Sequence, residues 1–163
     1  MHDLIRIVMI GAGATLLIDI WAIARQRWLG VPPPNYGLVG RWLAHMPKGR
    51  FRHEAIAKAA PVAGEKYLGW LAHYLIGMAF AAIVPLLWGR AWLDTPTLFP
   101  ALLVGVATVA APFLLMQPGM GAGIAARRTS KPAAARWQSL ITHTVFGAGL
   151  YAVASLIQLV PAQ

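Results

Sequence analysis

The sequence predicts an all-α membrane protein with four transmembrane helices and short interfacial helices in its first cytoplasmic segment. Three observations indicate this fold. Apolar residues make up 58% of the chain, charged residues make up only 12%, and four stretches of about 20 residues are almost free of charge. Ordinary soluble domains are about 45–50% apolar and about 25% charged. We therefore expect one integral membrane domain over residues 1–163.

The four apolar stretches are expected as spans over residues 4–24, 67–88, 98–116 and 138–160. A bilayer core about 30 Å thick requires about 20 apolar residues as helix, and backbone groups cannot stay unpaired in lipid. Buried helices of a soluble bundle would instead show a polar stripe with a period of 3.6 residues, and these stretches lack one. The first span ends in Ala22-Ile23-Ala24, which resembles a cleavage site, but Arg25 follows at once, so we expect a retained helix.

The basic residues are concentrated in two of the segments between spans. Twelve of the fourteen Lys and Arg residues lie in segments 25–66 and 117–137. The positive-inside rule places both segments in the cytoplasm and both termini on the outer side. Tryptophans at the span boundaries agree with this interpretation: Trp28, Trp42, Trp70, Trp88, Trp92 and Trp137. The net charge of +9 then fits anionic lipid headgroups, and we expect no nucleic-acid partner.

Each basic segment carries local signals of its own. Stretches Tyr36–Met46 and Phe51–Ala60, stopped by Pro47 and Pro61, mix apolar with basic residues, so both are expected as short interfacial helices. In the second segment, a glycine-rich turn over residues 117–123 precedes Arg127. Such a turn beside arginines can hold an anion, for instance a lipid phosphate.

Three ionisable residues lie inside the predicted spans: Asp19, His73 and His143. Ionisable groups are costly in a membrane, and they usually face the bundle interior or a water-filled cavity. At 1.5 Å per residue, all three are expected roughly 7–9 Å below the cytoplasmic boundary. The three side chains therefore share one layer of the predicted bundle.

Each of these residues also lies on a stripe of small or polar residues spaced four apart. Residues four apart occupy one helix face, and small residues mark the faces on which membrane helices touch. We therefore expect Asp19, His73 and His143 to point inward and to meet in a common pocket. The same small residues are also compatible with self-association of the protein into a homo-oligomer. The stripes consist of Gly11 and Thr15 before Asp19, Gly69, Gly77 and Ala81 around His73, and Ser139, Gly147 and Tyr151 around His143.

Four interpretations of this polar layer are open: a hydrogen-bonded latch between helices, a site for a small ligand or ion, a metal or haem site, and a membrane enzyme with a histidine base. We favour binding or conduction of a small ligand or ion over an enzymatic activity. The alternative is a metal- or haem-dependent redox protein or enzyme. The absence of cysteine excludes thiolate ligands, and the cofactor, if one exists, is unknown. Expected ligand-binding residues are Asp19, Glu65, His73, Gln117, Arg127 and His143. The metal-ligand candidates are His73, Met116 and His143, and the enzyme interpretation adds His45, His53 and Glu54.

Several motifs make the chain resemble a family of small bacterial inner-membrane proteins known only as a domain of unknown function. They include GAGAT at Gly11–Thr15, GWLAHYLIG at Gly69–Gly77, MQPGMGAGIAA at Met116–Ala126 and SLITHTVFGAGLY at Ser139–Tyr151. VGRW at Val39–Trp42 and GRFRH at Gly49–His53 extend the resemblance over nearly the whole chain. The resemblance implies a four-span protein of the bacterial inner membrane and transfers no catalytic residue.

Overall fold

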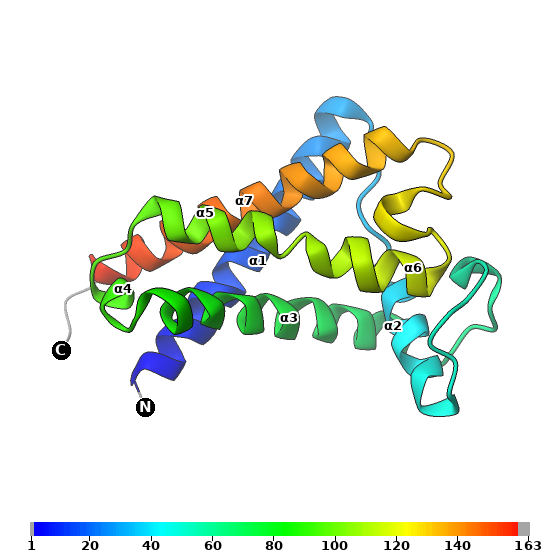
Figure 1. Ribbon diagram of the computed structural model, residues 1–163, viewed down its shortest axis with the longest axis horizontal. Coiled ribbons are helices and arrows are strands. Elements are labelled where there is room, and N and C mark those ends of the chain that lie inside the picture. Colours follow the sequence, from blue (N-terminus) through cyan, green and yellow to red (C-terminus); the bar gives the residue numbers. More distant parts are fainter. Residues whose placement is uncertain (1, 160–163) are drawn as a thin grey trace. The chain divides into compact units, whose positions relative to one another are not determined.

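The computed structural model describes residues 2–159, and within that range all regular secondary structure is helical (Figure 1). Four helical segments are long and apolar enough to cross a membrane: α1 (His2–Leu29), α3 (Glu65–Trp88), the segment Leu98–Met120, and α7 (Pro132–Gln158). The predicted fold class, with its four spanning helices, is confirmed. Residue 160, the predicted end of the fourth span, lies outside the described residues.

The helices belong to two compact units, each of which combines distant parts of the sequence. In the described part of the chain, unit 1 contains residues 2–33, 74–108 and 141–159, and unit 2 contains residues 34–73 and 109–140. Helices α3 and α7 each contribute to both units. The prediction of one domain over residues 1–163 stays a prediction.

Large apolar side chains occupy the outer faces of the spanning helices. The most apolar windows of the four segments are only 17–33% buried, and Leu86 on α3 is 79% exposed. Water-soluble proteins rarely expose apolar patches of this extent. An apolar exterior on long helices is instead the surface that a lipid bilayer would cover.

In unit 1, α1 and α3 cross where glycines remove the side chains between their backbones. A Cβ atom on Gly11 would collide with the backbone at Met78, and one on Gly77 would collide with the hydroxyl of Thr15. Thr15 is 1% exposed, and its hydroxyl donates to the carbonyl of Gly11 at 2.7 Å. The small-residue faces predicted on these two spans are therefore the surfaces on which the helices touch.

A second glycine crossing joins α5 (Leu98–Ala107) to α7 in the same unit. A Cβ on Gly147 would lie 2.8 Å from the carbonyl oxygen of Ala101, and a Cβ on Gly105 would collide with Gly147. Apolar side chains fill the rest of the unit 1 core. The core residues include Ile10, Ala14, Ala81, Val84, Trp92, Leu93, Val104, Phe146 and Leu150. The short helix α4 (Ala91–Asp94) connects α3 to α5 (Figure 1).

The third spanning segment differs from the uninterrupted helix that the sequence predicts over residues 98–116. Helix α5 ends at Ala107, the π-helix η3 begins at Pro112, and α6 covers Gln117–Met120. Pro112 has no backbone N–H and its ring disfavours a regular helical turn before it. The π-helix follows at this proline, and such single turns often occur at functional sites.

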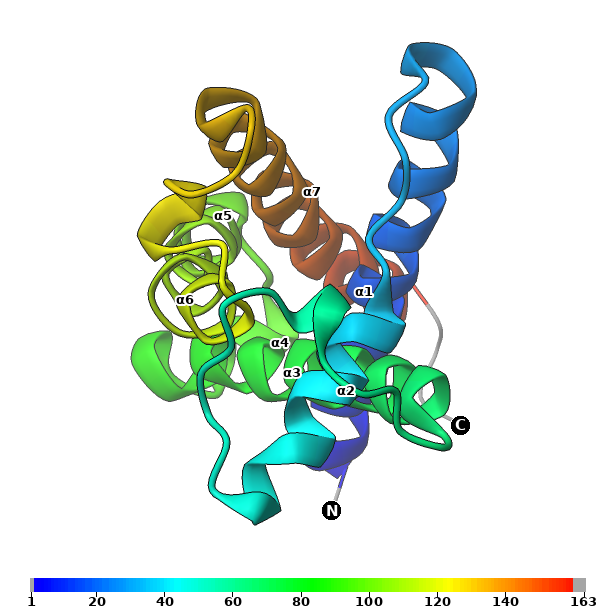
Figure 2. The same ribbon diagram turned by 90° about the vertical axis from the view of Figure 1, so that its right-hand side faces the viewer.

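Unit 2 begins with α2 (Tyr36–His45), which confirms that the first of the two predicted short helices forms. Its place at the membrane interface stays a prediction. The side chain of Asn35 caps its first turn by accepting from the N–H of Gly37. After the 3₁₀ turn η1 (Met46–Lys48), Gly49 stops the helical chain with a positive φ of 75°. Helix α2 crosses the first turns of α3 (Figure 2) at Gly40 and Gly69, where neither residue has room for a Cβ.

The prediction of a second interfacial helix over Phe51–Ala60 was wrong, because only the 3₁₀ turn η2 (Ile56–Lys58) forms there. Outside this turn, backbone groups of the segment bond to other elements. The N–H of His53 donates to the carbonyl of Gly119 at 2.9 Å, and the guanidinium of Arg41 donates to the carbonyl of Ala59 at 3.0 Å. Tertiary partners have replaced the helical hydrogen bonds that local sequence favoured.

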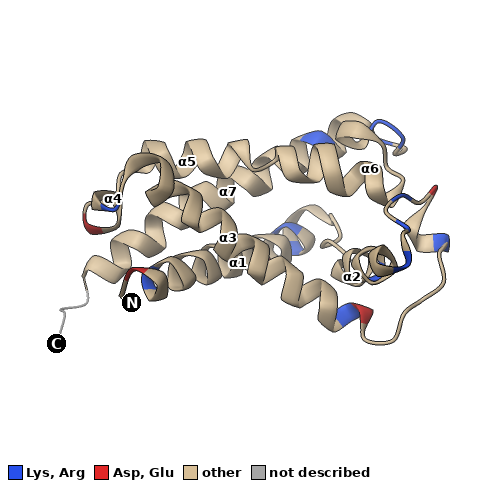
Figure 3. Ribbon diagram, turned by 60° about the horizontal axis from the view of Figure 1, so that its bottom comes forward, with Lys and Arg blue, Asp and Glu red and all other residues tan. Residues whose placement is uncertain are grey.

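The charged residues of unit 2 lie mainly on its connecting segments (Figure 3). Lys and Arg residues follow α2 and occur again after α6, where the 3₁₀ turn η4 (Ile124–Ala126) leads into the basic start of α7. In unit 1, Arg90 and Asp94 lie at the ends of α4 (Figure 3). The long apolar parts of the spanning helices between these positions are almost uncharged.

Candidate intramembrane polar site

Asp19 is a half-buried carboxylate on α1, in the unit 1 part of the chain. The hydroxyl of Tyr74, on α3, donates to Oδ2 of Asp19 at 3.0 Å. The crossing of Gly11 with Gly77 brings these two helices together, so the hydrogen bond forms about two helical turns farther along α1. Packing of small residues thus positions a charged group against a hydroxyl donor.

His143 lies on α7, one turn before Gly147, and reaches the end of α5. Its Nδ1 atom lies 3.0 Å from the hydroxyl of Thr108 and 3.2 Å from the carbonyl oxygen of Gly105. The Thr108 hydroxyl donates to the same carbonyl at 2.6 Å. The last carbonyls of a helix lack hydrogen-bond partners within the helix. At the end of α5, Thr108 and His143 supply partners for the carbonyl of Gly105.

His73 lies on α3 in unit 2, within a cluster of aromatic rings. Its ring stacks on Tyr36 with 4.1 Å between ring centres, and its edge meets Trp70 at 5.9 Å. Tyr36 begins α2, and its carbonyl lies against Gly69 at the crossing of α2 with α3. The prediction that Asp19, His73 and His143 meet in one pocket stays a prediction.

Glu65, at the start of α3, forms a two-point ion pair with Arg41 of α2. The guanidinium donates to Oε1 at 2.7 Å and to Oε2 at 2.8 Å, and the N–H of Val62 donates to Oε2 at 2.9 Å. The hydrogen bond from Arg41 is the main cause that lowers the pKa of Glu65 to about 2, with a further contribution from Val62. Arg41 also donates to the Ile56–Ala59 backbone, so this pair fastens the loop before α3.

Gln117 begins α6 directly after Met116, the last residue of the π-helix. The side-chain oxygen Oε1 of Gln117 is buried and has no hydrogen-bond partner among the residues that the structure describes. An unpaired buried acceptor is costly. Gln117, one of the ligand residues proposed from the sequence, therefore keeps a buried side-chain oxygen whose hydrogen-bonding capacity is unused.

Backbone N–H groups in and just after the glycine-rich turn donate to carbonyls of the same segment. The N–H of Ala122 donates to Gln117, and the N–H of Arg128 donates to Ala122. Gly123 has a φ of 74° and packs on the stems of Arg127 and Arg128. The exposed guanidinium of Arg127 is available to an anion, whereas these backbone donors are already used.

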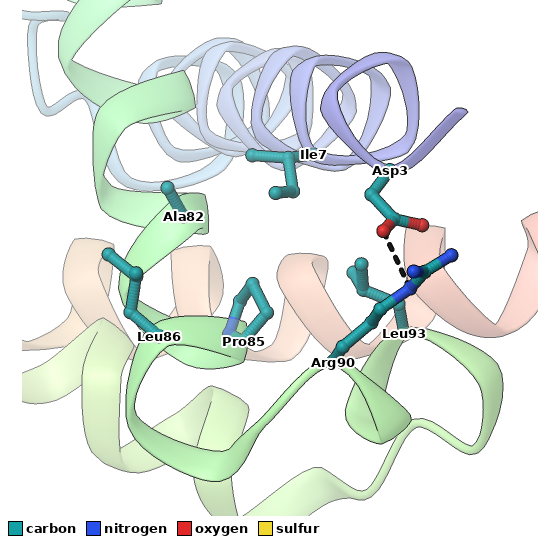
Figure 4. A pocket seen from close by; sticks show the side chains of 7 residues that line it. All are labelled: Asp3, Ile7, Ala82, Pro85, Leu86, Arg90 and Leu93. Atoms are coloured by element: carbon teal, nitrogen blue, oxygen red, sulfur yellow. Dashed lines mark ion pairs between the residues drawn. The ribbon is translucent and has the colours of Figure 1, made fainter. Parts of the chain in front are cut away.

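A further cavity of about 230 Å³ opens in unit 1, where α1 lies beside the end of α3 (Figure 4). It is lined by Asp3, Ile7, Ala82, Pro85, Leu86, Arg90 and Leu93. Arg90 pairs with Asp3 at 2.6 Å (Figure 4), and Arg6 pairs with Asp94 at 2.8 Å and donates to the carbonyl of Leu93. These ion pairs tie the start of α1 to the connection that contains α4.

Sequence reasoning missed the partners of the ionisable residues: Tyr74, Thr108, Tyr36 and Arg41. Thr108 had a usable signal, because it stands four residues before Pro112, where a helix is expected to break. Arg41 also had a usable signal, because it lies in an amphipathic stretch with few acidic residues nearby in sequence. Its ion-pair partner was therefore to be sought at a distant position. Within residues 2–159, no three His, Cys, Asp or Glu side chains are grouped so that they could hold a metal ion.

A family model described as "Protein of unknown function (DUF2938)" matches residues 8–157. The chain belongs to the DUF2938 family. Neither the curated proteins nor the solved structures gave a match to the chain. The resemblance stated from the sequence is thereby confirmed, and the polar contacts of this DUF2938 protein have to be interpreted from their own chemistry.

Proposed function

We propose that this DUF2938 protein binds or conducts a small cation or proton at Asp19, within its membrane-spanning helices. The observation that carries the proposal is the hydrogen bond from Tyr74 to Asp19 between two mainly apolar spanning helices. A carboxylate is expensive at such a position, and those that occur usually serve ion or proton pathways. Carboxylate and hydroxyl oxygens are also the ligands that hard cations prefer.

His143 gives the same unit a second polar group, on α7. Its contact with Thr108 and Gly105 lies at the end of α5, next to the break before the π-helix. Non-helical backbone at membrane depth is tolerated where it is buried in protein or lines a water-filled cavity. The broken segment therefore supports a polar path through unit 1, with His143 as a relay for protons.

We also propose an orientation for the four spans. The basic segments 25–66 and 117–137 would face the cytoplasm of a bacterial cell, with both termini outside its inner membrane. Anionic lipid headgroups would be the partners of the exposed arginines, among them Arg127. In this orientation the Asp19 site opens toward the cytoplasmic side.

The proposal is tested by ion flux into liposomes that contain the purified full chain. Proton entry and sodium entry are each followed with an internal fluorescent indicator under an imposed gradient. Asp19→Asn keeps the shape of the side chain and removes its charge, so flux should fall to that of empty liposomes. The matched control Asp94→Asn removes an exposed carboxylate and should keep the wild-type flux.

Two results would overturn the proposal. One is wild-type flux equal to that of empty liposomes for both ions, together with no change in thermal stability when either ion is added. The other is an Asp19→Asn variant that transports like the wild type. A structural latch predicts the first result, along with a loss of stability in Asp19→Asn.

A further inference from the structure

Two histidines of unit 2 lie outside the spanning helices, and their imidazole rings take part in none of the contacts described above. His45 is the last residue of α2, and His53 follows in the irregular segment that replaces the predicted second interfacial helix. Their ring centres are 5.1 Å apart, with the rings inclined at 66°.

The contacts of His45 define which of its nitrogens carries the proton. The residue is only 5% exposed, and its Nε2 lies 3.1 Å from the carbonyl oxygen of Ala60. A carbonyl can only accept, so Nε2 is the donor, and Nδ1 of the neutral ring presents a lone pair. That Nδ1 atom is buried and has no partner among the described residues.

This arrangement is the one that metal-binding histidines adopt. Such a histidine usually donates its other N–H to a backbone carbonyl or carboxylate, which fixes the ring and its tautomer. Here Ala60 supplies that carbonyl, and the unused lone pair of Nδ1 remains inside the protein. A buried acceptor without a partner is otherwise an unexplained cost.

His53 supplies a second nitrogen of the same kind. Its Nε2 is buried and has no partner within the described part of the chain, while its backbone N–H is fixed to the carbonyl of Gly119. Two imidazoles that bind one tetrahedral ion through nitrogens at about 2.0–2.1 Å place their ring centres about 5 Å apart. The separation of His45 and His53 matches that spacing.

Helix α6 brings a third unused atom to this unit. Gln117 lies two residues before Gly119, which accepts from His53 and packs under the ring of Trp42. Its Oε1 is the third buried side-chain atom of the unit without a partner among residues 2–159. Two imidazole nitrogens and an amide oxygen are ligand types that suit a divalent metal ion of the zinc class.

We propose that His45 and His53 bind a divalent transition-metal ion of the zinc class, with Gln117 as an oxygen ligand. The site fixes the segment after α2 onto α6, and its two histidines lie outside the spanning segments. It does not depend on the function proposed for Asp19. The competing occupant of the same three atoms is a hydrogen-bonded water molecule.

The test is zinc binding to the full chain, purified in detergent and stripped with a chelator. The wild type should bind one equivalent of Zn²⁺ and unfold at a higher temperature when zinc is present. His45→Gln and His53→Gln should each weaken binding by at least about tenfold and abolish the zinc-dependent rise in unfolding temperature. Gln117→Glu should bind more tightly, because a carboxylate replaces a neutral oxygen ligand.

The matched control is His2→Gln, which removes an exposed histidine of α1 and should bind zinc like the wild type. The proposal is overturned if the wild type binds no zinc, which is the result that a water-filled site predicts. It is also overturned if the His45 and His53 variants bind as tightly as His2→Gln does. If a histidine variant fails to fold, an unchanged zinc affinity in Gln117→Glu contradicts the role of Gln117, and the remaining histidine variant tests the pair.

Discussion

The Tyr74 hydroxyl donates a 3.0 Å hydrogen bond to Oδ2 of Asp19, so that α3 holds a carboxylate of α1. Both residues are half-buried, and the two helices approach closely through Gly11 and Gly77. Hydrogen bonds between membrane helices contribute about 0.6 kcal/mol on average and up to about 1.7 kcal/mol. The contact therefore stabilises the helix pair modestly while it orients the acidic group.

Tyr74→Phe removes the hydroxyl that orients Asp19 and keeps the ring. The free energy of unfolding in detergent should fall by about 0.6–1.7 kcal/mol, measured by denaturant titration. Tyr67→Phe is the matched control, since Tyr67 is 82% exposed and should unfold like the wild type. Equal stability of the wild type and Tyr74→Phe would show that the hydrogen bond contributes nothing.

Gly147→Ala adds one methyl group where α7 touches α5. The new Cβ would lie 2.8 Å from the Ala101 carbonyl, and backbone on both sides leaves little room to adjust. Overpacking of this kind costs typically 1–3 kcal/mol, so the thermal unfolding temperature should fall. Ala148→Val, at the exposed neighbouring position, adds more volume and should change the unfolding temperature little. A Gly147→Ala variant as stable as Ala148→Val would mean that the helices do not touch there.

Acidification should weaken the ion pair between Arg41 and Glu65. Arg41 lowers the pKa of Glu65 to about 2 in the folded protein, against about 4.3 in an unfolded chain. The stabilisation is fully present above the unfolded value and is lost as the pH falls toward the folded one. Unfolding temperatures measured from pH about 6 to about 3 should therefore decline in the wild type.

Glu65→Gln should show a smaller decline over the same pH range, because the titrating carboxylate is gone. Glu54→Gln is the control, since Glu54 is exposed and precedes the same helix, and it should keep the wild-type pH dependence. Identical pH profiles for Glu65→Gln and the wild type would contradict the assigned role of this ion pair.

The chain has no cysteine, so single cysteines can report the proposed orientation. Thr95→Cys, between α4 and α5, should react with a membrane-impermeant maleimide on intact bacterial spheroplasts. Ser130→Cys, before α7, should react only after the membrane is opened. Both positions are exposed in the fold. The opposite pattern of labelling would reverse the orientation inferred from the basic residues.

The spans could be predicted because their signal is local and large. About twenty apolar residues in a row leave few alternatives to a membrane helix, and the small-residue faces at Gly77 and Gly147 follow from helical periodicity. Periodicity gives the face of a residue but not the residue opposite it. Tyr74 and Thr108, the partners of Asp19 and His143, depend on which helices cross and at what height.

Local sequence failed where distant groups compete for the backbone. The Phe51–Ala60 stretch has a reasonable helical pattern, but Arg41 donates to its carbonyls and the N–H of His53 donates to the carbonyl of Gly119. The break before Pro112 could have been expected from the proline alone. The π-helical turn over Pro112–Met116 could not have been expected, because the sequence carries no local signal for it.

In the proposed function, the carboxylate of Asp19 itself binds the ion. Infrared difference spectra of the protein in lipid discs, recorded between sodium and choline buffers and between two pH values, test this most directly. We expect carboxyl bands that respond to sodium or to protons in the wild type and disappear in Asp19→Asn, with Asp94→Asn unchanged. Ion-dependent bands that persist in Asp19→Asn, or a wild type without such bands, would contradict it.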